Sequence, residues 1–172
     1  MVPADLPVLL IVEDNADMRH YIRKTLSDQY QIIEAENGKA GLAQAKESLP
    51  DLIISDIMMP EMDGYKLCEL IKSNELTSHI PVILLTAKAD RESKLQGLGT
   101  RADDYLAKPF DADELKLIVR NRIEERRKMR ERFSREVTLE PRQIAITSLD
   151  EKFLTKVLAI IEEHMDDEQF SI

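Results

Sequence analysis

The stretch from Leu52 to Gly64, LIISDIMMPEMDG, decides the fold. It begins with the apolar run Leu52–Ser55, and nearly continuous runs of Leu and Ile are typical of parallel strands covered on both faces. The carboxylate of Asp56 follows among apolar neighbours. Burial of an unpaired carboxylate costs on the order of several kcal/mol, so Asp56 is expected to meet a cation or a proton.

Short apolar runs of this kind alternate along the chain with amphipathic segments. The predicted strands are Val8–Val12, Gln31–Ala35, Leu52–Ser55, Pro81–Thr86 and Tyr105–Ala107. The predicted helices are Asp17–Ser27, Lys39–Ser48, Gly64–Ser73, Arg91–Leu98 and a fifth that begins near Asp111. The alternation predicts an α/β fold, with a five-stranded parallel sheet of order 2-1-3-4-5, helices on both faces and a C-terminal helical extension.

Composition sets bounds on the class of protein. The chain has 172 residues, enough for one domain and an extension, and a net charge of −9, which disfavours nucleic-acid binding by the first domain alone. It contains no apolar run long enough to cross a membrane, no signal peptide is visible, and the single Cys68 cannot form an internal disulfide. We therefore expect a cytoplasmic protein without membrane contact.

The fifth helix is expected to continue past the domain. An apolar stripe of Leu115, Ile118, Val119 and Ile123 is suited to packing on the sheet, whereas Glu124–Arg132, EERRKMRER, contains only one apolar residue. This charged segment is interpreted either as a solvated face or as a coiled-coil-like dimer contact. The expected division is a first domain at residues 1–125, a helical connector and linker at 126–149, and a second helical segment at 150–172.

Polar residues follow four of the predicted strands. Glu13 and Asp14 follow the first strand, Asp56 follows the third, Thr86 is the last residue of the fourth, and Lys108 follows the fifth. In an open parallel sheet, ligands bind beyond the carboxyl ends of the strands. The proposed strand order makes these four strands neighbours, so the sequence predicts one shared site.

The residue types at these strand ends suit phosphoryl transfer. Grouped carboxylates need a cation, and Mg²⁺ binds through a few carboxylates and a substrate phosphate. Asp56 is central and is predicted to be the nucleophile that becomes an aspartyl phosphate. Lys108 is predicted to supply a second positive charge, and the Thr86 hydroxyl to donate to a phosphoryl oxygen.

The predicted metal ligands surround this nucleophile. Asp14 is the best direct ligand for Mg²⁺, with Glu13 beside it, directly or through water. Asp56 is included among the metal ligands, and the backbone carbonyl of Met58 is a further candidate.

Four motifs resemble the receiver domain of bacterial response regulators: LLIVEDN, DLIISDIMMPEMDG, PVILLTAK and ADDYLAKPF. The resemblance covers about residues 6–125 and together the motifs are specific. It implies a CheY-like, flavodoxin-like fold of five strands and five helices. It also implies Mg²⁺-dependent phosphorylation of Asp56 by the phosphohistidine of a partner histidine kinase, in cis or in trans, followed by self-catalysed hydrolysis.

The same resemblance assigns roles residue by residue. The family's acidic pair maps to Glu13 and Asp14, its hydroxyl switch to Thr86, its aromatic switch to Tyr105 and its lysine to Lys108. It makes the Lys108–Pro109 bond a candidate cis peptide, the alternative being a trans proline that opens the next helix. One departure is Arg101, which stands where the family often has glycine, so the local loop is open to question.

The last residues carry a second, shorter resemblance. Residues 149–172, LDEKFLTKVLAIIEEHMDDEQFSI, resemble the lead-in and first helix of an AraC-type DNA-binding domain attached to receivers in hybrid sensor proteins. The helix-turn-helix itself is absent, so this domain is expected to be truncated and DNA binding to need a domain missing from this chain. A role in transcription regulation is expected on the same basis, whereas a homodimer is expected from the charged extension of the fifth helix.

Three rival functions share parts of this pattern. A flavin-binding flavodoxin-like protein would need a phosphate loop after the first strand, where Glu13 and Asp14 instead repel phosphate. A Mg²⁺-dependent phosphatase with an aspartate nucleophile would place Asp-x-Asp there, a spacing that is absent. A degenerate receiver used only for dimerisation would have lost an acid, Thr86 or Lys108. We therefore expect a phosphoacceptor rather than a turnover enzyme.

Overall fold

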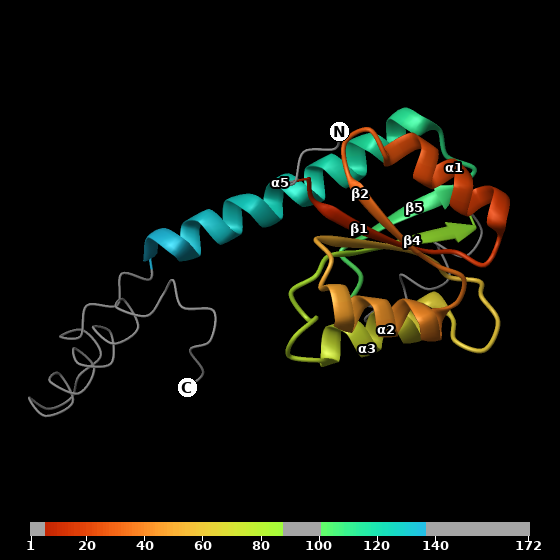
Figure 1. The fold of residues 1–172 in the computed structure, drawn as a ribbon, viewed down its shortest axis with the longest axis horizontal. Coiled ribbons are helices and arrows are strands. Elements are labelled where there is room, and N and C mark those ends of the chain that lie inside the picture. The colour runs from red at the N-terminus through yellow and green to blue at the C-terminus, as the bar shows by residue number, and fades with distance from the viewer. Residues whose placement is uncertain (1–5, 88–100, 137–172) are drawn as a thin grey trace, which may run out of the picture. The chain divides into compact units, whose positions relative to one another are not determined.

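A computed structural model describes residues 6–87 and 101–136. Its core is a five-stranded parallel sheet of order β2-β1-β3-β4-β5, which confirms the predicted fold class (Figure 1). The strands are β1 Val8–Val12, β2 Gln31–Ala35, β3 Leu52–Asp56, β4 Val82–Ala87 and β5 Asp104–Lys108. The last three extend one residue further at their carboxyl ends than predicted, so Asp56 and Lys108 are themselves strand residues.

The described helices lie where the amphipathic segments predicted them. They are α1 Ala16–Leu26, α2 Gly38–Ser48, α3 Gly64–Ser73 and α5 Ala112–Glu136. The side chains of Asn15, Asn37 and Asp63 cap the first three helices by accepting a backbone N–H three residues later. The predicted helix Arg91–Leu98, the linker after residue 136 and the segment 150–172 lie outside the described residues.

The sheet separates two hydrophobic clusters, and this division fixes which helices cover which face. Alternate residues of β1 point to opposite faces: Leu10 and Val12 pack in the cluster under α2 and α3, and Leu9 and Ile11 in the one under α1 and α5. Figure 1 shows these two helix pairs on opposite sides of the sheet. Because both faces are covered, β1 and β3 read in the sequence as continuous apolar runs.

Helix α5 is anchored on the sheet and is continuous through the charged segment. Leu115 and Val119 are fully buried, and Ile118 and Ile123 pack against the same cluster, which confirms the predicted stripe. Farther along the helix, the Arg126 guanidinium donates to the carbonyls of Pro50 and Asp51. Contacts divide the chain into units at 1–128 and 129–172, and residues 129–136, the last part of α5, are the described part of the second unit.

Within the two described ranges, no helix is both long and apolar enough to cross a membrane. Arg101 is exposed, and the Lys108–Pro109 bond is cis, as predicted.

Candidate functional site

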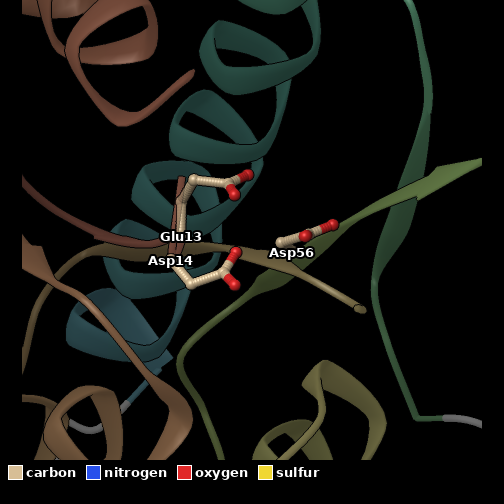
Figure 2. Close-up of side chains that lie close together, drawn as sticks. All are labelled: Glu13, Asp14 and Asp56. Atoms are coloured by element: carbon tan, nitrogen blue, oxygen red, sulfur yellow. The ribbon is translucent and has the colours of Figure 1, made fainter. Parts of the chain in front are cut away.

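Three carboxylates converge at the carboxyl ends of two neighbouring strands. Val12, the last residue of β1, pairs with Ser55 of β3, so the next residue along each chain segment, Glu13 just after β1 and Asp56 at the end of β3, comes beside the other. Carboxylate oxygens of Glu13, Asp14 and Asp56 all lie within 4.8 Å of one another, and Figure 2 shows the three side chains together. The predicted acidic cluster is therefore present.

Glu13 is the most deeply buried member of the cluster. Its side chain is 1% exposed, Oε1 accepts from the Asn15 N–H at 3.1 Å, and Oε2 accepts from the Lys108 ammonium at 3.1 Å. Burial raises the pKa of the Glu13 carboxyl, although the Lys108 and Asn15 hydrogen bonds act in the opposite direction. Glu13 therefore resists ionisation more than a surface glutamate, and a bound cation would favour its charged form.

Lys108 bridges the two buried carboxylates. Its ammonium lies 2.9 Å from Asp56 Oδ1 and 3.1 Å from Glu13 Oε2. Burial alone would lower the pKa of Lys108, but hydrogen bonds to Asp56 and Glu13 outweigh it and raise the pKa. The lysine therefore stays charged at neutral pH and meets the requirement for a cation beside Asp56.

Asp56 is held in place by its own backbone as well as by the lysine. The residue is 5% exposed, and Oδ1 accepts from the Ile57 N–H at 2.9 Å in addition to its contact with Lys108. At the start of α3, Gly64 packs so tightly on Asp56 that an added Cβ would lie 2.2 Å from the Asp56 carbonyl oxygen. Strand β3 and helix α3 thus fix the main chain of Asp56 from two sides.

The cluster opens into a surface cleft beside α1. Its lining comprises Glu13, Asp14, Asn15, Asp17, Met18, Tyr21, Asp56 and Lys108. Asp14 is exposed, and the Lys108 ammonium pairs with Glu13 and Asp56, two of the three clustered carboxylates. Hard oxygen donors with uncompensated negative charge fit a divalent cation such as Mg²⁺, which retains several waters and accepts an oxygen of a bound phosphate.

The other predicted residues lie near the cluster without joining it directly. The buried Thr86 lies on β4, where its hydroxyl donates to the Ala87 carbonyl at 3.0 Å. Tyr105 on β5 is half-buried and packs against the cluster of apolar residues under α2 and α3. The Met58 side chain is 68% exposed in the loop after β3. The roles predicted for Thr86, Tyr105 and the Met58 carbonyl stay predictions.

Sequence reasoning missed three residues that shape the site. Asn15 caps α1 and donates its N–H to Glu13, Gly64 permits the close approach of α3, and Arg19 donates from Nη1 to the Glu13 carbonyl at 2.7 Å. An Asn directly after the acidic pair is a recognisable cap signal. The Arg19 contact has no local signal, because it depends on how α1 folds back over the end of β1.

This arrangement defines an α/β domain with an acidic, cation-attracting site at the carboxyl edge of a parallel sheet. Residues 9–120 match the family described as response regulator receiver domain. The chain belongs to this family, and the site is accordingly that of a phosphoacceptor domain of two-component signalling proteins.

Known proteins that resemble the chain include a kinase and two solved receiver domains. Histidine kinase P4 of Formosa agariphila is 44% identical over 95% of this chain, which spans 12% of that protein's length. The receiver domain of a histidine kinase from Syntrophus aciditrophicus is 36% identical with a TM-score of 0.65, covering 69% of this chain and 91% of its own. The receiver domain of a sensor histidine kinase from Pseudomonas aeruginosa is 34% identical with a TM-score of 0.62, covering 69% of this chain and 98% of its own.

The last of these structures bears on the metal. It contains a magnesium ion coordinated in its active-site cleft. Receiver domains bind Mg²⁺ at an acidic site, and this chain places Glu13, Asp14 and Asp56 in such a cluster. The chain's own oxygen donors therefore agree with the metal found in a relative.

Proposed function

We propose that Asp56 accepts a phosphoryl group from the phosphohistidine of a histidine kinase in a Mg²⁺-dependent reaction. The observation that carries this proposal is the position of Asp56, a buried carboxylate within reach of two further carboxylates and 2.9 Å from the Lys108 ammonium. A purely structural carboxylate would need the lysine alone. The additional acids, Glu13 and Asp14, are explained by a metal ion that they bind together with the phosphoryl group of the donor.

In the proposed reaction, a carboxylate oxygen of Asp56 attacks phosphorus in line with the leaving imidazole. A phosphorus–oxygen bond forms, the phosphorus–nitrogen bond of the phosphohistidine breaks, and the leaving nitrogen takes its electron pair. Glu13, Asp14, Asp56 and the Met58 carbonyl would hold Mg²⁺, which neutralises phosphoryl charge. Lys108 stays charged and stabilises the oxygens that Asp56 and the phosphoryl group present to it.

Phosphorylation is proposed to act on the surface through Thr86 and Tyr105. A phosphoryl group adds roughly two negative charges beside Lys108. In this proposal the Thr86 hydroxyl leaves the Ala87 carbonyl and donates to a phosphoryl oxygen, and Tyr105 moves farther inward from its half-buried position. Because Tyr105 lies on β5, next to the anchored start of α5, the change would reach the helix that leads out of the domain.

The wider setting follows from the relatives and is part of the same proposal. We propose a cytoplasmic receiver within a longer hybrid kinase, since a histidine kinase matches 95% of this chain at 44% identity. The kinase phosphodonor then acts in cis or in trans. A dimer through α5, an AraC-type domain from about residue 150 and transcription regulation as the output belong to the same proposal, and the segment from residue 150 lies outside the described residues.

Incubation with acetyl phosphate and Mg²⁺ tests the proposal against its rivals. A receiver should gain one phosphoryl group per chain, only with Mg²⁺, and lose it slowly as inorganic phosphate. Continuous turnover of small phosphate esters would instead indicate a phosphatase. Absence of labelling, with the domain folded, would indicate the alternative function, a degenerate receiver used only for dimerisation.

A further inference from the structure

The guanidinium of Arg19 connects three elements at the edge of the acidic site. From the second turn of α1, its Nη1 donates to the Glu13 carbonyl at 2.7 Å. Its Nε and Nη2 lie 3.6 Å and 3.4 Å from carboxylate oxygens of Glu34 and Glu36, in and just after β2. The Arg19 side chain is only 15% exposed, and its bond to the Glu13 carbonyl is partly buried, whereas its partner Glu36 is 78% exposed and that contact is open to solvent.

The Glu13 carbonyl belongs to the peptide that joins the two adjacent acids. Successive residues of a strand point to opposite faces, so an extended backbone would send Glu13 and Asp14 apart. Their carboxylate oxygens nevertheless lie within 4.8 Å of one another. Strand β1 ends at Val12, so this peptide lies just beyond the extended strand, and the charge-assisted hydrogen bond from Arg19 holds the peptide oxygen on one side.

The remaining contacts of Glu13 show how this residue is held. The Glu13 N–H donates to the Ala35 carbonyl of β2 at 3.1 Å, and its side chain is held by Asn15 and Lys108. These bonds fix the strand side of Glu13. The bond from Arg19 acts on the other side of the residue, where the direction of Asp14 is set.

We propose that Arg19 is a positioning residue for the metal site: its hydrogen bond to the Glu13 carbonyl turns Asp14 toward the ion that Glu13 and Asp56 face. This inference rests on the proposed function, because it assumes that the three carboxylates bind Mg²⁺. It assigns the cluster of Arg19, Glu34 and Glu36 a role in metal affinity in addition to any role in stability.

Whether Mg²⁺ affinity rises or falls when Arg19 is replaced distinguishes a positioning role from a purely electrostatic one. Arg19 is a cation near a cation site, so removing its charge alone would strengthen Mg²⁺ binding. Loss of positioning would weaken binding instead. Arg23 offers a matched control, because it lies one turn later on α1 and pairs with the same Glu34, at 3.1 Å, on a largely exposed side chain.

The test is a Mg²⁺ titration of the full, unphosphorylated chain by isothermal titration calorimetry. Arg19→Met and Arg23→Met remove the same charge, and circular dichroism checks that each variant is folded. R19M should bind Mg²⁺ about ten-fold more weakly, the lower end of the effect of residues that orient metal ligands, while R23M binds as tightly as the wild type or more tightly. Equal or tighter binding by R19M, or equal weakening in both variants, would overturn the proposal.

Arg19→Lys keeps the test decisive if R19M does not fold. An ammonium can retain the charge but not the three-way contact, so R19K should bind about three-fold more weakly, half the loss on a free-energy scale. Unchanged affinity in R19K would overturn the proposal in that case. Failure of the wild type to bind Mg²⁺ would instead contradict the proposed function, which makes the two failures distinguishable.

Discussion

Replacing Gly64 by alanine tests how closely helix α3 must approach the strand that carries Asp56. A Cβ at this position would lie 2.2 Å from the Asp56 carbonyl oxygen and 2.9 Å from the Ile57 Cα. Ordinary contact begins at 3.4 Å, so helix and strand would have to separate by about 1.2 Å, the difference between 3.4 and 2.2 Å. The obstructing atoms are backbone and cannot rotate away, so Asp56 itself is expected to move.

Two opposing effects set the size of the change in stability. Alanine is favoured over glycine within a helix by about 1 kcal/mol, whereas overpacking typically costs about 1–3 kcal/mol. The difference between the two effects is a fall of up to about 2 kcal/mol in the free energy of unfolding of G64A. Because a displacement of about 1 Å at a reacting group can cost about a hundred-fold in rate, phosphorylation by acetyl phosphate should slow by about that factor.

Gly41→Ala is the matched control for this experiment. Gly41 is a buried glycine of α2, but a Cβ there would meet the methyl groups of Val12, at 2.7 and 2.9 Å, rather than backbone. Urea unfolding measures stability, and the time course of phosphoryl incorporation by intact mass measures the rate. G41A should keep most of the rate even if it loses comparable stability. Phosphorylation of G64A at the wild-type rate would refute the reasoning, and equal rate losses in both variants would indicate general destabilisation instead.

Three further predictions follow from the charges and burial of the site. Lys108→Ala removes the cation shared by Glu13 and Asp56, so the domain should be less stable without Mg²⁺ and should regain part of that stability when Mg²⁺ is added. Urea unfolding at two Mg²⁺ concentrations measures the change. A loss of stability that is the same at both concentrations would contradict the prediction. Because the pKa of Glu13 is higher in the folded chain than in the unfolded chain, protonation of Glu13 stabilises the metal-free fold. This stabilisation is fully present below the pKa of the unfolded chain and is lost as the pH rises through the pKa of the folded chain. Mg²⁺ affinity should accordingly fall on acidification from a higher pH than for an ordinary glutamate, and E13Q should lack that pH dependence in calorimetric titrations. Burial raises the pKa of Cys68 to about 11, so its thiol should resist iodoacetamide at mildly alkaline pH until urea unfolds the domain; rapid alkylation of the folded chain would show that it is accessible.

The sheet and the acidic cluster were predictable because both depend on the spacing of apolar and charged residues along the sequence. Apolar runs and their alternation with amphipathic segments specify a parallel sheet, and the carboxyl ends of neighbouring strands must then meet. The sequence therefore predicts that Glu13, Asp56 and Lys108 converge, as they do in the structure. Strand β3 ends one residue later than predicted, because the backbone of Asp56 still pairs with β4.

The detailed arrangement within the cluster was not predictable. Because β1 is buried on both faces, its pattern gives no indication that Glu13 turns inward while Asp14 faces the cleft. The hydroxyl of Thr86 has several possible acceptors, and only the folded backbone shows that it donates to Ala87. Arg19 and Gly64 contact main-chain carbonyls, those of Glu13 and Asp56, and a pattern of side chains gives no information on such contacts.

The measurement that tests the central claim most directly is the site of phosphorylation. The wild type, Asp56→Asn and Asp63→Asn are incubated with acetyl phosphate and Mg²⁺ and compared by intact mass and peptide mapping. Asp63 is a suitable control, because it caps α3 from the same loop and asparagine caps a helix equally well. We predict one phosphoryl group on Asp56 in the wild type and in D63N, and none in D56N. Labelling of folded D56N, or a phosphoryl group mapped to another residue of the wild type, would contradict the account.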